Sequence, residues 1–400
     1  MEIKDRREIA VKGSYDVIVA GGGIAGIAAA VTAARRGAAV LLLEKSVNLG
    51  GLATNGLISW YEPLCDGKGQ KVMGGMAEEL LKLSIKYGFD NLPPKWGGSR
   101  TEPKRNERYS TYFSPAIFSL ALDELIRDNG VTLRYDTYAV YPVTDGGHCA
   151  GVICESASGR EFFGAKVLID ATGDASVADR AGVPTVLGEN YMTYLVHSFD
   201  RDGAAKFAAD GDLCSFRQWK NAGSDMLGNG HPEGKPKLSG STAEEITEYM
   251  EIGKQRMLDR VKELDRERFD IMSLPFMPQL RTIRHIVGQT EFRAEAGKEF
   301  SDSIGVCGDF RPSGIGNHYQ VPFGALYHEQ IDNLLAAGRI ISAPQGDGWE
   351  VSRVIPVCAL TGEAAGNAAY LAVREGCGIS RIPIERLQAL QEESGNRISL

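Results

Sequence analysis

The stretch Val17-Ile-Val-Ala-Gly-Gly-Gly-Ile-Ala-Gly26 decides the fold of this chain. An apolar run rich in β-branched residues stops at the pattern Gly21-x-Gly23-x-x-Gly26, and a helix of small residues follows as far as Gly37. A second apolar run, Val40-Leu-Leu-Leu, then ends in Glu44. This order of strand, glycine turn, helix, strand and acid predicts a βαβ unit that binds a dinucleotide.

Each residue of the glycine turn has its own expected task. We expect Gly21 to permit the tight turn out of the strand, Gly23 to let the backbone approach a pyrophosphate, and Gly26 to let the helix lie close to the sheet. Amide groups near Ala25, at the N-terminus of the helix, would face the phosphates. Glu44 is expected to accept hydrogen bonds from a ribose diol and to repel a 2′-phosphate, which favours FAD or NAD over NADP.

The segment after the acid separates the two remaining cofactors. An NAD domain would continue into further short βα units, whereas here Glu44-Lys45 leads into a second glycine pair, Gly50-Gly51, followed by Leu52. Two glycines at this place indicate a second close approach of the backbone to the same extended ligand. The pattern favours FAD, with an NAD-dependent dehydrogenase as the alternative.

Further motifs follow in a specific order over nearly the whole length. They are Phe113–Leu125 before Gly130, Ile169–Asp174, Ala337–Ser342 and Gly362–Gly366. Together with the glycine turn, this order resembles the FAD-dependent oxidoreductase family of the glutathione reductase type 2 flavoprotein superfamily. The chain is also distantly similar to the succinate dehydrogenase and fumarate reductase flavoproteins.

The resemblance implies further contacts with FAD. It places the backbone near Ala139 and Val140 beside the adenine, and the start of the helix after Arg353 beside the flavin pyrimidine, where the positive helix end stabilises the reduced ring. Succinate dehydrogenase-type proteins carry a histidine near the second glycine pair that links covalently to FAD, but residues 45–60 contain none. We therefore expect FAD to be bound non-covalently. The other residues implied to contact it are Thr172, Gly173, Gly338, Arg339 and Gly362.

The expected fold class is α/β, with a Rossmann-like FAD/NAD(P)-binding domain and an inserted α+β substrate or cap domain. Apolar runs at 138–143, 148–155 and 160–169 predict a β-meander that returns to the parallel sheet. The FAD-binding domain is expected to be discontinuous, and the two domains are assigned from the segment order. The FAD-binding domain takes residues 1–60, 113–189 and 331–400, and the cap takes 61–112 and 190–330.

Composition limits the partners and the compartment. The 400 residues have a net charge of −8 and no basic run, which argues against nucleic acid or an anionic membrane as a partner. No 18-residue apolar run predicts a membrane span, and the first residues do not resemble a secretory signal. The seven cysteines are scattered without a CxxC pair, so we predict reduced thiols, a cytoplasmic location, no dithiol chemistry and no metal site.

The candidate catalytic residues are those that can hold a substrate or move a proton beside a flavin. Four of them form two clusters in the sequence, Arg281 with His285 and His318 with Tyr319. The fifth, Arg353, precedes the last long helix. The predicted function is hydride exchange between flavin N5 and a small polar substrate such as a sugar, polyol or hydroxy acid. The sequence does not identify the electron acceptor or the oligomeric state, and a homo-oligomer is among the states left open. A non-catalytic flavin-binding subunit is the alternative from another functional class.

Overall fold

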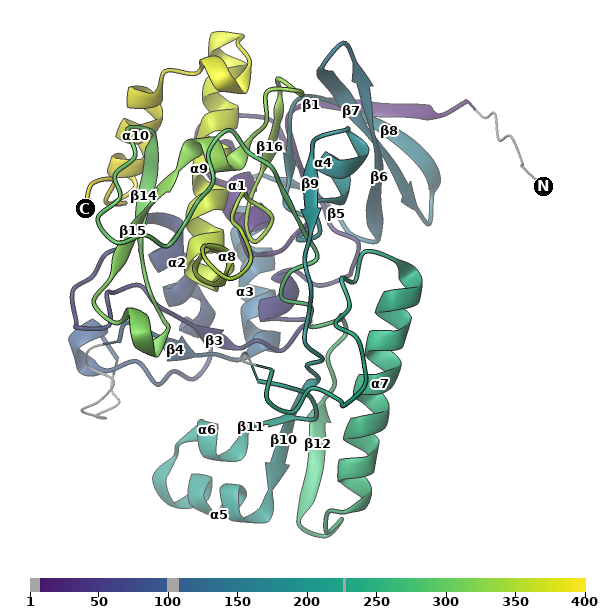
Figure 1. Ribbon diagram of the computed structural model, residues 1–400, viewed down its shortest axis with the longest axis vertical. Helices are drawn as coiled ribbons and strands as arrows, with labels where there is room; N and C mark the ends of the chain where they lie inside the picture. The colour runs from purple at the N-terminus through teal and green to yellow at the C-terminus, as the bar shows by residue number, and fades with distance from the viewer. Residues whose placement is uncertain (1–7, 99–107, 226–227) are drawn as a thin grey trace.

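A seven-stranded sheet is the centre of the structure, a computed structural model that describes residues 8–98, 108–225 and 228–400. Its strands run in the order β5-β2-β1-β8-β7-β6, and β16 pairs with β8 off this path (Figure 1). The strands are β1 (Ala10–Ala20), β2 (Val40–Leu43), β5 (Thr132–Arg134), β6 (Thr137–Asp145), β7 (His148–Ser156), β8 (Gly159–Asp170) and β16 (Leu334–Ala336).

The parallel strands end at one level of the sheet. Ala20 at the end of β1 lies opposite Leu43 of β2 and Asp170 of β8, and Asp170 lies opposite Ala336 of β16. The meander β6-β7-β8 is antiparallel, as the three apolar runs predict. Four carboxyl ends therefore meet at one edge, which is where α/β sheets bind ligands.

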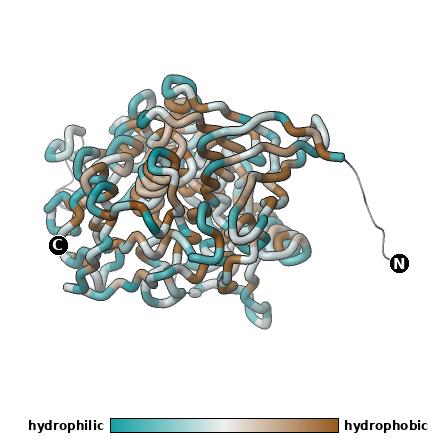
Figure 2. Tube along the Cα trace, turned by 90° about the horizontal axis from the view of Figure 1, so that it is seen from above, coloured by the Kyte–Doolittle hydropathy of each residue, from teal (hydrophilic) through white to brown (hydrophobic). Residues whose placement is uncertain are grey.

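The two faces of the sheet have separate cores. One face packs against α1 (Ile24–Arg35), α2 (Gly75–Ile85), α3 (Pro115–Asp128) and α9 (Ile355–Glu375), and α4 (Ser176–Arg180) covers the other. Apolar residues gather inside the molecule, and hydrophilic residues predominate in its outer loops (Figure 2). None of the described helices combines the length and apolar character needed to cross a membrane.

Helices α1 and α9 approach each other closely. A Cβ atom on Gly362 would lie 2.1 Å from the carbonyl oxygen of Ala25, and one on Gly366 would lie 2.5 Å from that of Ala29. Glycine is thus required on α9 at both positions, because any side chain would push the helices apart. Gly362 therefore acts by packing against the glycine-turn helix.

The cap forms a second body at one end of the molecule (Figure 1). Its sheet has the order β11-β10-β12, and α7 begins after Thr242, whose hydroxyl accepts a hydrogen bond from the Glu245 amide at 3.2 Å. Buried residues such as Tyr194, Tyr249 and Met257 form its own cores. The elements are β10 (Leu195–Asp200), α5 (Arg201–Asp210), α6 (Leu213–Phe216), β11 (Gln218–Asn221), α7 (Ala243–Lys262) and β12 (Phe269–Ser273).

Fewer residues pack in the cap cores than the predicted cap boundaries, 61–112 and 190–330, contain. Residues 61–112 and the 303–322 hairpin, both assigned to the cap, share the large core with α1 and α9. The apolar side chains of these segments pack on α9 and not on the cap sheet, so we propose that the segments belong with the FAD-binding domain. The remaining strands and α-helices of the structure are β3 (Trp60–Tyr61), β4 (Thr111–Tyr112), β9 (Thr185–Leu187), β13 (Arg284–Ile286), β14 (Ser303–Gly308), β15 (His318–Pro322), α8 (Trp349–Ser352) and α10 (Ile384–Glu393).

Candidate functional site

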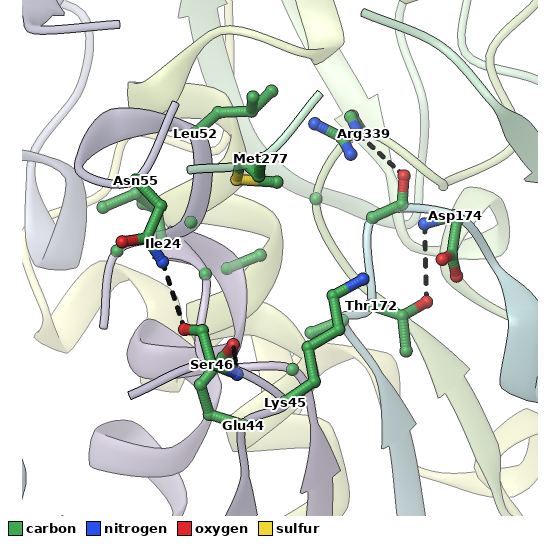
Figure 3. A pocket seen from close by; sticks show the side chains of 18 of the residues that line it. Ile24, Glu44, Lys45, Ser46, Leu52, Asn55, Thr172, Asp174, Met277 and Arg339 are labelled. Atoms are coloured by element: carbon green, nitrogen blue, oxygen red, sulfur yellow. Dashed lines mark hydrogen bonds between the residues drawn. The ribbon is translucent and has the colours of Figure 1, made fainter. Parts of the chain in front are cut away.

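A cavity of about 410 Å³ lies at the carboxyl ends of the parallel strands (Figure 3). The first residue after each of β1, β2, β8 and β16 lines it: Gly21, Glu44, Ala171 and Ala337. The sheet register therefore brings four segments that are distant in sequence to one site.

The glycine turn shows three different steric demands. A Cβ on Gly21, whose φ is 106°, would lie 2.5 Å from the Ala171 carbonyl oxygen, and one on Gly26 would lie 1.8 Å from the Gly21 carbonyl oxygen. A Cβ on Gly23 would meet no atom within 4 Å. Gly21 and Gly26 are thus required by the fold, whereas Gly23 leaves space that the fold itself does not use. Such space beside a helix N-terminus fits a pyrophosphate.

The second glycine pair forms the opposite wall of that space. The Gly50 amide donates to the Gly22 carbonyl oxygen at 2.9 Å, and a Cβ on Gly51 would lie 3.2 Å from the Gly23 Cα. Both glycines have positive φ, 101° and 57°. The loop therefore needs glycine for its own conformation and for its close approach to the turn.

Glu44 is fixed by two backbone amides. Its Oε2 accepts from the Gly22 amide at 2.7 Å. Its Oε1 accepts from the Ser46 amide, also at 2.7 Å (Figure 3). The side chain is only 8 % exposed, yet it lines the cavity. Lone pairs that the amides leave free can accept hydrogen bonds from a ribose diol.

The cavity continues from Glu44 toward β6, the expected adenine end. Lys45, Tyr138 and Ala139 line this part. Val140 is not among the lining residues, and its carbonyl oxygen accepts from Arg180 Nη1 at 2.8 Å. Of the two residues that the resemblance places beside the adenine, Ala139 therefore lines the cavity and Val140 does not.

The other end of the cavity reaches the N-terminus of α9. Arg339 Nε donates to the Gly173 carbonyl oxygen at 2.7 Å, which ties the loop after β16 to the loop after β8 (Figure 3). Gly338 has a φ of 84°, and a Cβ there would lie 2.9 Å from the Ala25 Cβ. The lining residues of this end are Thr172, Gly173, Asp174, Gly338, Arg339, Arg353, Ile355 and Cys358.

Positive charge accumulates at the α9 end. Burial and then the like charge of Arg281 lower the pKa of Arg353 to about 10, and burial lowers the pKa of Arg339. Burial also raises the pKa of the Cys358 thiol to about 11, so this thiol is protonated at neutral pH. The end of the cavity is therefore cationic and holds no reactive thiolate.

Four of the five predicted catalytic residues are absent from the described cavity lining; Arg353 alone belongs to it. His285 is buried in β13, with Nδ1 3.0 Å from the Ile286 carbonyl oxygen. Arg281 Nη1 donates to the Asp225 carbonyl oxygen at 3.2 Å. These positions give no support to a direct catalytic contact by His285, while Arg281 acts on the site through its charge.

The second cluster is built around a carboxylate. Tyr319 donates its hydroxyl hydrogen to Asp309 at 2.9 Å, and Arg311 binds the same carboxylate at 2.7 Å. Tyr319 is thereby committed to a structural contact in the β14–β15 hairpin. His318 Nδ1 is buried and has no hydrogen-bond partner in the structure.

The cap contributes lining residues that the sequence analysis missed. The Phe276 amide donates to the Asn55 carbonyl oxygen at 2.8 Å, and Met277 lines the cavity on the same side of the view as Leu52 and Asn55 (Figure 3). Phe276 is 81 % exposed although it lines the cavity. The remaining cap residues of the lining are Ile246, Pro278 and Ile283. The only signal was an apolar, proline-flanked segment between β12 and Arg281.

The buried histidine His197 was not among the residues predicted from the sequence. His197 lies on β10, and its Nε2 accepts from Trp219 Nε1 at 3.0 Å and lies 3.2 Å from Ser59 Oγ. An indole N–H can only donate, so Nε2 is the unprotonated nitrogen. Burial, followed by the charge of Arg217, lowers the pKa of His197 to about 4. The neutral ring joins the cap sheet to the segment after the second glycine pair.

Comparison with known proteins shows the family. The chain matches the FAD dependent oxidoreductase family over residues 16–198 and 201–391. It is 27% identical over 216 residues to digeranylgeranylglycerophospholipid reductase from Methanoculleus marisnigri, a match that spans 49% of each protein, so the chain covers about half of that relative.

Solved structures share the fold at low identity. One is p-nitrophenol 4-monooxygenase from Pseudomonas putida DLL-E4, with a TM-score of 0.50, 13% identity, and coverage of 96% of this chain and 84% of that one. Another is a geranylgeranyl bacteriochlorophyll reductase-like protein from Thermoplasma acidophilum, with a TM-score of 0.48, 14% identity, and coverage of 95% and 83%.

The family match decides between the cofactors and functional classes that the sequence left open. FAD is the cofactor, which corrects the alternative of an NAD-dependent dehydrogenase. The protein is an oxidoreductase enzyme, which corrects the alternative of a non-catalytic subunit. The glycine turn, the acid after β2 and the cavity at the sheet edge fit that cofactor. The chain belongs to the FAD-dependent oxidoreductase family.

Proposed function

We propose that the protein exchanges a hydride between flavin N5 and a small polar substrate at the α9 end of the cavity. The observation that carries this proposal is the polar, cationic character of that end, where Arg339, Arg353 and Asp174 line the wall. Polar side chains placed in a concave site fix the orientation of a ligand. A polar substrate would have partners here that an apolar one would leave unpaired.

Bound FAD would supply the hydride acceptor or donor, and the residues of the chain would position and stabilise the reactants. The N-terminus of α9 directs its positive end toward the cavity through Ile355 and Cys358. Arg339 is held by the Gly173 carbonyl oxygen at 2.7 Å. The positive helix end and Arg339 would favour negative charge on a reduced ring, while the cap segment at Met277 would limit the access of water.

The experiment that tests this function is an anaerobic photometric screen of the purified protein. Sugars, polyols, hydroxy acids and amino acids are mixed with the oxidised enzyme, and flavin absorbance is followed. We expect one polar class to bleach the flavin. The proposal is wrong if only apolar compounds bleach the flavin. It is also wrong if no polar class reduces the oxidised enzyme and no oxidised counterpart of these compounds reoxidises the reduced enzyme.

FAD is expected to leave the protein on acid precipitation. The described lining of the cavity contains no histidine, and Cys358 points its Sγ at the Arg353 carbonyl oxygen, 3.3 Å away. We therefore propose a non-covalent cofactor. All flavin absorbance should appear in the supernatant after precipitation with trichloroacetic acid, and flavin fluorescence of the washed pellet would contradict this expectation.

We also propose a cytoplasmic location, with an electron acceptor from the same compartment. All seven cysteines are free, and four of them, including Cys65 and Cys307, are buried. Thiols that persist without disulfides are typical of a reducing compartment.

A further inference from the structure

Phe276 is an exposed aromatic residue in the part of the cavity wall that the cap supplies. It is 81 % exposed, and Tyr138 is the only other aromatic residue in the described lining. A single exposed apolar side chain is common on protein surfaces and implies no function by itself. Phe276 differs from such residues because it borders the cofactor site, where most of its surface is open to a bound ligand.

Hydrogen bonds on both sides of Phe276 fix its backbone. The Phe276 amide donates to the Asn55 carbonyl oxygen at 2.8 Å, and Gln279 Nε2 donates to the Gly56 carbonyl oxygen at 2.7 Å. Gln279 is itself buried, and its Oε1 accepts from the Leu195 amide at 2.7 Å. A ring on a fixed backbone loses little conformational freedom when a ligand binds, so more of its contact energy appears as affinity.

A chain of hydrogen bonds connects this segment to the acid that would bind the ribose. Asn55, whose carbonyl oxygen holds the Phe276 amide, donates from Nδ2 to Ser46 Oγ at 3.1 Å (Figure 3). The Ser46 amide in turn donates to Glu44 Oε1 at 2.7 Å. Phe276 is thus tied to the end of the cavity where the AMP half of FAD is expected.

Adenine is the part of the AMP half that a phenyl ring can cover. Aromatic side chains stack on the flat faces of bases and bury apolar surface of both rings. The ribose hydroxyls and the phosphates would gain no hydrogen bond from such a ring. The isoalloxazine is the other flat ring of FAD, but its expected place is the α9 end, lined by Arg339, Arg353 and Cys358.

We propose that Phe276 packs against the adenine of FAD, so that the cap itself holds the AMP half of the cofactor. The inference concerns the cofactor and applies whatever the substrate is. The glycine turn and Glu44 would bind the polar groups of the same half, and Phe276 would cover its one apolar surface.

The test measures cofactor binding by the apoprotein. Phe276→Ala should raise the dissociation constants of FAD and of ADP by the same factor, between about 5- and 100-fold, the range for removal of one aromatic contact with a base. Flavin fluorescence follows FAD binding, and isothermal titration calorimetry follows ADP. The absorbance spectrum and the midpoint potential of FAD bound at saturation should not change, because the flavin ring is not touched.

Three further measurements separate this role from a structural one. Phe276→Tyr and Phe276→Trp should retain affinities closer to wild type than to Phe276→Ala, because both keep an aromatic face. Leu274→Ala is the matched control, since Leu274 is 43 % exposed, lies two residues away and is absent from the described lining. It should keep wild-type affinity. The free energy of unfolding of the Phe276→Ala apoprotein should equal that of wild type, because the ring is exposed.

The other outcomes contradict the proposal. Unchanged FAD affinity in Phe276→Ala, or no binding of ADP to the wild-type apoprotein, would show that the ring does not hold the AMP half. A loss of FAD affinity with unchanged ADP affinity and a shifted flavin spectrum would place Phe276 on the isoalloxazine instead. An equal loss in Leu274→Ala, or a loss that neither Tyr nor Trp restores, would mean that the substitution disturbs the cap and not a stacking contact.

Discussion

Gly23→Val is expected to abolish measurable FAD binding while the protein remains folded. A Cβ at this position meets no protein atom within 4 Å, so the fold can accommodate the side chain. The same space is where the cofactor pyrophosphate would contact the helix N-terminus. Loss of two or more charge-assisted hydrogen bonds there corresponds to at least about 100-fold in affinity. FAD titration of the apoprotein, together with circular dichroism, measures both effects.

Gly26→Val is the matched control for this experiment. Its Cβ would lie 1.8 Å from the Gly21 carbonyl oxygen, so α1 must move away from the sheet. We expect this variant to lose thermal stability even without cofactor. Wild-type affinity in Gly23→Val would show that the pyrophosphate lies elsewhere.

Acidification from pH 6.5 toward 4 is expected to destabilise the protein through His197. The folded-state pKa is lowered to about 4 from the ordinary value of 6.5, so the unfolded state binds the proton first as the pH falls. The contribution of neutral His197 is complete above pH 6.5 and is lost progressively down to about pH 4. A difference of this size corresponds to about 3 kcal/mol of the free energy of unfolding.

Urea unfolding between pH 7 and 4.5 measures this loss against His197→Gln. Asp170 changes the free energy of unfolding in the opposite direction on acidification. Burial raises its pKa to about 6, so the folded state binds the proton first as the pH falls. Since Asp170 is present in both proteins, the difference in pH dependence isolates His197. We expect wild type to lose more of its free energy of unfolding on acidification than His197→Gln does, and the control His328→Gln to follow the wild-type profile. Parallel profiles for wild type and His197→Gln would show that His197 is not held neutral.

The cofactor half of the fold was predictable because its signals are local. The glycine turn and the acid at Glu44 occupy fixed places in a βαβ unit, and the helix predicted between the glycine turn and Gly37 corresponds to α1 at Ile24–Arg35. The β-meander followed from alternating apolar runs. Backbone geometry imposes these residue types regardless of what packs around them.

The rest of the site depends on tertiary contacts that no local pattern encodes. His285 and His318 stood out only as polar residues near glycines, and nothing in their spacing showed that His285 lies in the buried strand β13. The cap residues Phe276 and Met277 reach the cavity through one backbone bond to Asn55. Likewise, the apolar residues of 61–112 have no pattern that says which of two cores they join.

The close contact of α1 with α9 has a consequence for biosynthesis. Ala25 is synthesised long before Gly362, which would press on its carbonyl oxygen if it carried a side chain. The βαβ unit therefore lacks its packing partner until α9 has been made, and such non-local contacts slow folding. A ligand that binds only the folded form stabilises that form, so FAD would stabilise the protein once the glycine turn and the start of α9 have come together. Cofactor supply would then govern how much newly made protein survives quality control.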